Sequence, residues 1–355
     1  MNKYMISAAL SGAIMIPAAA FAHQLPLSGN DIADAERYDT KDHGGSNQTE
    51  GKDIGLRRRT AEGGWTHLKA GATDGKVLSN WNVYGKPFYA MASGTVIGCW
   101  RNAPENTPGS YHPDYKPGFK IPGGGNLLWI RQDDGSIALY AHARPGSIPA
   151  SICPNNAKLL TGNSGGGSAG VILAETQVVN GARIQAGLKL GEIGNSGASE
   201  GGPHLHVHME KDGSPFPGIG VPMNFDRGLT TPWISKASLD GPWTSVAGKP
   251  LPNALILFWP PRPIGNYTLN GIAGTSHQRY VEHFANSGML PNTITCTANG
   301  ATYNTKWIPA TGQWASFHDM SPATATAKHS YYTQQGYTRT SNYICGAVSV
   351  AVWRK

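Results

Sequence analysis

Three histidines occupy alternate positions in the run Gly202–His208, namely His204, His206 and His208. Side chains of an extended strand alternate between two faces, so the three imidazoles are expected on one face. Each ring carries two polar nitrogens, and burying them without a proton partner or a metal is costly. A His-rich surface strand is the plain alternative, but the sharp turn Gly194–Gly197 before the run would fix the strand in place. The pattern therefore predicts a metal or acid–base site.

The elements that must position these histidines are strands and loops. The chain has 355 residues, 46 Gly, 25 Pro and 14% charged residues. This composition indicates a β-rich protein with large loops, and the length indicates more than one folding unit. A net charge of +7 suits an anionic partner such as nucleic acid, a membrane surface or a cell-wall polymer. Apart from Arg57–Arg59 there is no Lys/Arg-rich stripe, so nucleic acid is not expected.

The first residues have the pattern of a secretory signal. Lys3 precedes a mostly apolar stretch, Tyr4–Ala20, and Ala20-Phe21-Ala22 has the form of a cleavage site. The apolar stretch is too short and too interrupted for a membrane span. We therefore expect a signal peptide over residues 1–22 and a secreted or periplasmic protein with no membrane span.

Four cysteines in an exported chain predict two disulfides. Three connectivities are open, and pairing within each half is the simplest, joining Cys99 to Cys153 and Cys296 to Cys345.

The C-terminal part contains a helix–hairpin unit twice. Cys296 corresponds to Cys345, and Trp307 corresponds to Trp353. A spacing of about 45–50 residues predicts two units that complete one core together. The aromatic residues of these repeats are expected mainly in that core, with wall or sugar binding as the alternative. The predicted organisation is a signal peptide (1–22), an irregular arm (23–62), a β domain (63–228), a Pro/Trp-rich connector (229–268) and a two-repeat α+β domain (269–355).

Four segments occur in a specific order along the β domain: 85–96, 139–142, 178–191 and 194–206. With this combination the chain, over about residues 85–225, resembles the lysostaphin/LytM-type zinc metallopeptidases. Their catalytic domain is a β-sheet fold related to the duplicated hybrid motif. The resemblance implies a mainly β protein, with an antiparallel β-sheet peptidase domain beside the small α+β domain, and Zn²⁺ as cofactor.

The resemblance also implies roles for particular residues. His206 matches a zinc ligand, while His204 and His142 match the pair that transfers protons and stabilises the tetrahedral intermediate. The family's early ligands are a His and an Asp four positions apart, and no His-x-Gly-x-Asp occurs here. His67 and Asp74 are the expected metal ligands in their place.

Three points stay open in this assignment. His67 and Asp74 are alternatively loop residues beside an incomplete metal site. His43 and Asp53 are substitutes that lie farther upstream. His208 takes a position that is often acidic in the family, and the sequence assigns it no role.

The implied function is that of a secreted zinc endopeptidase that cleaves the peptide cross-bridges of bacterial peptidoglycan. Its partner is then peptidoglycan, or a Gly-rich peptide if the substrate is a protein. The alternative is a catalytically inactive relative that binds peptidoglycan or activates a separate cell-wall amidase. The cleaved bond, the oligomeric state and an inhibitory role of the N-terminal arm do not follow from the sequence.

Overall fold

The computed structural model describes residues 22–43, 48, 50–115, 119–162, 172–211, 219–232, 237–252 and 255–355. The predicted signal peptide, except Ala22, lies outside these described residues. The chain divides into two compact units, with the boundary between Pro260 and Pro261. In the described part of the chain, no helix is both long and apolar enough to cross a bilayer.

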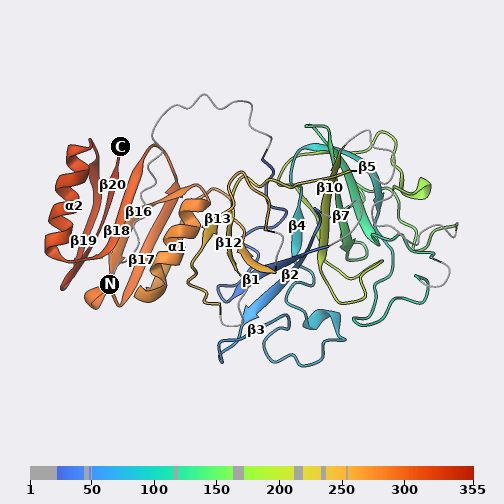
Figure 1. The fold of residues 1–355 in the computed structure, drawn as a ribbon, viewed down its shortest axis with the longest axis horizontal. Coiled ribbons are helices and arrows are strands. Elements are labelled where there is room, and N and C mark those ends of the chain that lie inside the picture. The colour runs from blue at the N-terminus through green and yellow to red at the C-terminus, as the bar shows by residue number, and fades with distance from the viewer. Residues whose placement is uncertain are drawn as a thin grey trace. The chain divides into compact units, whose positions relative to one another are not determined.

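The larger unit is built on one mainly antiparallel sheet (Figure 1). Within the described residues its main path runs, in spatial order, through β13 (Thr244–Ser245), β12 (Leu229–Pro232), β14 (Ile256–Trp259), β1 (Glu36–Asp42), β2 (Lys52–Arg59), β10 (Leu205–Lys211), β7 (Ser136–Ala143), β6 (Asn126–Gln132), β5 (Gly94–Trp100) and β8 (Arg183–Ile184). Two short strands join it at the side: β3 (Trp65–Thr66) pairs with β2, and β11 (Gly220–Val221) pairs with β10. The pair β4 (Pro87–Tyr89) and β9 (Lys189–Glu192) forms a separate ribbon. Short 3₁₀ turns lie at Leu78–Asn80 and Ala174–Thr176.

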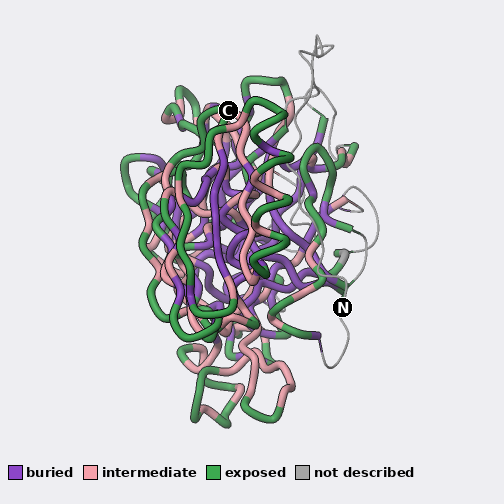
Figure 2. Tube along the Cα trace, turned by 90° about the vertical axis from the view of Figure 1, so that its left-hand side faces the viewer, coloured by how far each residue is buried: buried purple, intermediate pink, exposed green. Residues whose placement is uncertain are grey.

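The central strands β6, β7 and β10 are buried on both faces over most of their length. A core of apolar residues covers part of this sheet, including Trp100, Leu127, Trp129, Leu139 and Leu160. Asp133–Gly135 makes the tight turn between β6 and β7, with Gly135 at φ +87°. Figure 2 shows the buried backbone running through the interior, with most loops exposed.

Two segments expected to be irregular contribute strands to this sheet. The predicted arm, residues 23–62, contains β1 and β2, and the predicted connector, residues 229–268, contains β12, β13 and β14. The charged sequence of β1 hides its strand character, because only its pairing with β2 and β14 buries Tyr38. A strand with several charged residues can still pair in a sheet, because strand formation depends strongly on the neighbouring strands. The local sequence of β1 therefore did not indicate a strand.

The C-terminal unit consists of two successive strand–helix–strand–strand segments. The first is β15 (Tyr267–Ala273), α1 (Gly274–Asn286), β16 (Met289–Cys296) and β17 (Thr302–Pro309), with a 3₁₀ turn at Ala298–Gly300 between its last two strands. The second is β18 (Trp314–Met320), α2 (Pro322–Gln334), β19 (Thr338–Cys345) and β20 (Val348–Arg354). The two sheets have the equivalent orders β15-β17-β16 and β18-β20-β19. This equal order fits the predicted internal repeat.

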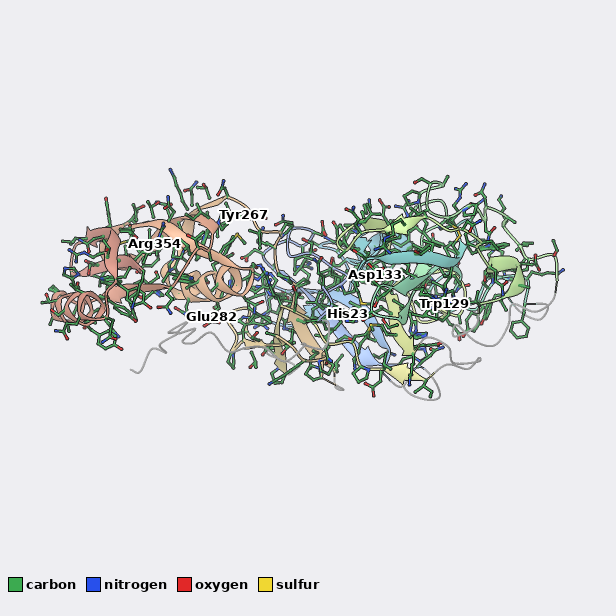
Figure 3. All side chains as sticks on the ribbon, turned by 90° about the horizontal axis from the view of Figure 1, so that it is seen from above. His23, Trp129, Asp133, Tyr267, Glu282 and Arg354 are labelled. Atoms are coloured by element: carbon green, nitrogen blue, oxygen red, sulfur yellow. A yellow bond between two sulfur atoms is a disulfide. The ribbon has the colours of Figure 1, made fainter. Side chains whose placement is uncertain are left out.

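Covalent and polar contacts join the two halves of the C-terminal unit. The Cys296–Cys345 disulfide links the ends of β16 and β19, which belong to different sheets. Arg354, labelled in Figure 3, donates to Oδ1 of Asn292 across the same boundary (2.8 Å). The second disulfide, Cys99–Cys153, lies in the larger unit, so both bridges pair within halves as predicted.

Candidate metal centre

The histidine strand β10 lies inside the large sheet, between β2 and β7 (Figure 1). In the register of these strands, His206 is directly opposite Asp53 of β2 and Ala141 of β7. Residues directly opposite in antiparallel strands share one face of the sheet. Asp53 therefore shares a face of the sheet with His206 and His208 of β10, and His204 immediately precedes this strand. His206 and His208 are fully buried, because this central strand is covered on both sides.

Three side chains of this face converge. His43, Asp53 and His206 each offer one ligand atom, and these atoms all lie within 4.8 Å of one another. Nδ1 of His206 is 2.9 Å from Oδ1 of Asp53, and the rings of His43 and His206 meet edge to face at a centroid distance of 4.6 Å. Two imidazoles and a carboxylate are a donor set that suits zinc.

The hairpin between β1 and β2 brings His43 to the cluster. His43 follows the last residue of β1, and Gly51 precedes the first residue of β2. The amide of His43 donates to the carbonyl of Gly51 (3.3 Å), which closes the base of the described part of this turn. His43 is exposed, whereas His206 is buried, so the cluster lies where the sheet meets solvent.

The charges around Asp53 favour its ionised form. Burial alone would raise the pKa of this carboxyl, but the hydrogen bond with His206 and the nearby His204 and His43 hold it well below its usual range. The pKa of His206 falls to about 4, mainly because burial disfavours the charged ring. At neutral pH the cluster thus presents a carboxylate and a neutral imidazole, which are the protonation states that bind a metal.

His142 and His204 lie beside this cluster. Their rings have a centroid distance of 4.8 Å, and the ring of His142 is 6.0 Å from that of His206. Nε2 of His204 is 3.6 Å from Oδ1 of Asp53. The structure therefore brings His142, His204 and His206, the three predicted site histidines, into one group.

Backbone acceptors orient both of these rings. Nδ1 of His142 lies 2.7 Å from the carbonyl of Ser196, and Nδ1 of His204 lies 3.0 Å from the carbonyl of Gly202. A carbonyl only accepts, so each Nδ1 carries a hydrogen. Burial, together with His204 and His206, holds the pKa of His142 well below its ordinary value, so this ring is neutral.

His142 also has an unusual backbone. Its backbone angle φ is +68°, a value that residues other than Gly rarely adopt. Its amide donates to the carbonyl of Gly124, and its carbonyl accepts from the amide of Gly194. These two hydrogen bonds hold the strained conformation, as is common where a side chain must be aimed at a site.

The structure does not assemble the expected ligand set His67, Asp74 and His206. Nδ1 of His67 is 3.8 Å from Oδ1 of Asp39, and its ring packs against Trp81 at a centroid distance of 5.6 Å. Oδ1 of Asp74 accepts from the amide of Lys76 in an exposed turn. In the part of the chain that the structure describes, neither residue belongs to a group of three or more potential ligands. Instead, His43 and Asp53 are the residues that converge with His206.

A sequence signal for Asp53 was present. Gly51-Lys52-Asp53 is the Gly-x-Asp half of the expected pattern, and the residue four positions before Asp53 is Thr49. The histidine of the cluster lies ten positions before Asp53, so a search for a fixed spacing misses it. Because residues 23–62 were expected to be irregular, this pair was not connected with the sheet.

No protein-family model and no curated protein sequence matches the chain. Similar solved structures include the catalytic domain of the antimicrobial peptidase lysostaphin from Staphylococcus simulans (17% identity, 53% of this chain and 86% of that chain, TM-score 0.24). They also include a putative glycyl-glycine endopeptidase LytM from Ruminococcus gnavus (19%, 57% and 57%, TM-score 0.28) and a zinc-containing peptidase from Vibrio cholerae (15%, 49% and 53%, TM-score 0.20). Identities and TM-scores this low carry no functional argument, so the inferences below rest on the side chains.

Proposed function

We propose that this protein is a zinc metalloendopeptidase that hydrolyses peptide cross-bridges of bacterial peptidoglycan. One observation carries the proposal: His43, Asp53 and His206 converge beside two further histidines, His142 and His204, whose Nδ1 atoms face backbone carbonyls. Three protein ligands leave room for a water or a substrate at a catalytic zinc, whereas structural zinc sites are closed by four ligands.

The residues divide the chemistry between them. When bound, zinc supplies the Lewis acidity that polarises a scissile carbonyl and activates water. Asp53, His206 and His43 would hold the ion. Nε2 of His204 or of His142 accepts the proton of the attacking water, and the same pair returns a proton to the leaving amine nitrogen. The hydrogen bonds to Ser196 and Gly202 keep both rings in the tautomer that this transfer needs.

The substrate follows from charge and from the resemblance. A net charge of +7 concentrates the protein on an anionic wall. Small residues, Gly or D-Ala, are the proposed side chains at the cleaved bond. Gly-rich proteins are the second substrate class for the same site. The two disulfides and the signal sequence support a secreted or periplasmic location.

The second candidate function is that of an inactive relative that binds peptidoglycan or activates a cell-wall amidase. The observation that favours it concerns His43, the first of the three potential ligands in the sequence. His43 is exposed and stands ten positions from Asp53, and Thr49 occupies the position four before Asp53. An exposed ligand holds its metal less tightly than one locked by packing, and turnover depends on that hold.

Zinc content and turnover distinguish the two functions. Wild type and the variants His43→Ala, Asp53→Ala and His206→Ala are dialysed against buffered zinc, and bound metal is measured by mass spectrometry. We expect one zinc per chain in wild type, substoichiometric zinc in each variant, and release of soluble peptides from purified peptidoglycan by wild type only. Zinc without peptide release supports the inactive relative. Absence of stoichiometric zinc in the folded wild type contradicts the metalloenzyme.

A further inference from the structure

A chain of close polar contacts runs along the buried face of β10. Oδ1 of Asp53 is 2.9 Å from Nδ1 of His206, and Nε2 of His206 is 2.8 Å from Nδ1 of His208. Nε2 of His208 is in turn 3.1 Å from Oε1 of Glu210. His206, His208 and Glu210 stand at every second position of the strand and therefore share a face. The four groups form one continuous series from the metal cluster into the protein interior.

The surroundings of the two inner groups are closed. His208 is fully buried and Glu210 is 7% exposed. The edge of Trp129, labelled in Figure 3, meets the ring of His208 at a centroid distance of 5.6 Å. Leu139 of β7 lies directly opposite His208. With apolar groups on these sides, His206 and Glu210 are the groups that satisfy the two nitrogens of His208.

The direction of the hydrogen bonds follows from the acceptor at the inner end. A carboxylate only accepts, so Nε2 of His208 donates to Glu210. A neutral imidazole has one N–H, and Nδ1 of His208 must then accept. Nε2 of His206 therefore donates to His208, and Nδ1 of His206 keeps its lone pair. That lone pair faces the carboxylate of Asp53 at 2.9 Å, and two acceptors this close require a shared cation.

The opposite direction of the hydrogen bonds would place two facing acceptors at the inner end of the series, between His208 and Glu210. If Nδ1 of His206 donated to Asp53, Nδ1 of His208 would have to donate to His206. Nε2 of His208 would then oppose Oε1 of Glu210 as a second acceptor at 3.1 Å, inside the protein. Among the described residues, a further potential ligand, His43, is found at the outer end, where it completes a possible metal site. A cation between Asp53 and His206 thus favours the hydrogen-bond direction in which Glu210 accepts from His208.

We propose that His208 and Glu210 are positioning residues, which hold a hydrogen on Nε2 of His206 and so make Nδ1 of His206 the metal-binding atom. The inference rests on the proposed metal centre and goes beyond its three ligands. Partners of this kind orient a ligating imidazole and raise its basicity, and losing one typically weakens metal binding about 10–100-fold. Here the carboxylate of Glu210 acts on His206 through the imidazole of His208.

The test measures zinc affinity by competition with a chromophoric chelator, and the ring ¹⁵N shifts of His206 by NMR in the zinc-loaded protein. His208→Leu removes the acceptor while keeping an apolar filling, and we expect about 10–100-fold weaker zinc binding. Glu210→Leu is expected to weaken binding in the same direction. Glu210→Gln keeps an acceptor oxygen and is expected to restore most of the affinity, which packing alone does not explain. The ¹⁵N shifts of wild type should show Nε2 protonated and Nδ1 ligating.

Trp129→Phe is the matched control, because it changes the packing against His208 and removes no member of the series. It should bind zinc as wild type does, with circular dichroism confirming the fold of every variant. If His208→Leu does not fold, the difference in zinc affinity between Glu210→Leu and Glu210→Gln tests the inference. Unchanged affinity in folded His208→Leu or Glu210→Leu, or ligation of His206 through Nε2, overturns this inference alone. A folded wild type that binds no zinc overturns the proposed function as well.

Discussion

At the scale of single residues, the two histidines beside the cluster have their protons placed by backbone carbonyls. Nδ1 of His142 donates to Ser196, and Nδ1 of His204 donates to Gly202. Neither ring belongs to the group that could hold a metal. The proposed function therefore assigns proton transfer and metal binding to different side chains, and single substitutions test this division.

If His142 and His204 transfer protons as proposed, replacing either residue should lower turnover strongly and leave zinc in place. We expect His142→Ala and His204→Ala to lower kcat/KM about 10²–10⁴-fold, the usual contribution of a positioned general acid or base. Zinc stoichiometry should equal that of wild type. A synthetic cross-bridge peptide and metal analysis of the same samples measure both quantities. Loss of zinc together with activity would instead make these rings ligands.

His67 and Asp74 should be dispensable for metal binding. Burial and the positive charge of Arg57 lower the pKa of His67, while Asp39 raises it, so this ring belongs to a separate polar group. Asp74 shapes an exposed turn. We expect His67→Ala and Asp74→Ala to retain stoichiometric zinc, measured beside His43→Ala. Zinc lost from either variant would restore the ligand set that the sequence first suggested.

Sequence reasoning grouped His204 with His206 but gave His43 and Asp53 only as substitutes. Alternation along residues 204–208 and the turn before them were enough for the first result. Asp53 is different, because its position depends on pairing between β2 and β10, strands about 150 residues apart in sequence. No local sequence pattern in residues 36–59 predicts that β2 pairs with β10.

At the scale of elements, the hairpin between β1 and β2 needs Gly51. A Cβ atom there would lie 2.8 Å from the carbonyl oxygen of Gln48, 3.2 Å from Cβ of His208 and 3.3 Å from Cε1 of His206. The first of these contacts is with backbone, which cannot easily move aside. The absence of a side chain thus lets the turn that carries His43 pack directly on the histidine strand.

Gly51→Ala should therefore damage the site without touching a ligand. Overpacking of this kind costs about 1–3 kcal/mol, and displacement of the turn should weaken zinc binding as well. Denaturant unfolding and zinc titration measure the two effects. Gly75→Ala is the control, since a Cβ atom there meets nothing within 4 Å. Equal behaviour of the two variants would show that the turn adjusts freely.

The C-terminal unit shows which elements a sequence reveals well. Its helices and hairpins were visible from spacing, because each segment is local and occurs twice. The first strand of each segment, β15 and β18, was not predicted. These strands pair with β17 and β20, across the helix, so their partners are not sequence neighbours. Local periodicity does not report such pairing.

At the scale of the whole molecule, the Cys296–Cys345 bridge stabilises one unit. It closes a loop with a sequence separation of 49, and loop-closure entropy assigns about 4 kcal/mol to a loop of that length. We expect Cys296→Ser with Cys345→Ser to raise hydrogen exchange throughout residues 267–354. Exchange in β2, β7 and β10 should stay unchanged. Cys99→Ser with Cys153→Ser should have the reverse pattern, and uniform loosening by either pair would contradict two independent units.

The second feature at this scale is a buried histidine that makes the C-terminal unit sensitive to acid. His277 of α1 stacks on Tyr303 at a centroid distance of 4.3 Å, and its Nε2 contacts Oγ1 of Thr305 at 3.0 Å. Burial and the neighbouring His318 lower its pKa from 6.5 to about 3, against the smaller opposing effect of Asp319. The unfolded chain therefore binds more protons than the folded unit between these two pH values.

The stability that this ring contributes is fully present above about pH 6.5 and is lost as the pH falls towards 3. The shift corresponds to about 5 kcal/mol, as an order of magnitude, across that window. We expect hydrogen exchange of peptides from residues 274–309 in the full chain to accelerate as the pH falls from 6.5 to 4, after correction for intrinsic exchange. His277→Gln keeps an amide that can contact Thr305 and removes the titrating ring, so its stability should depend less on pH over this range. An equal pH dependence in wild type and variant would assign the acid sensitivity to other groups, because His277 is the one difference between them.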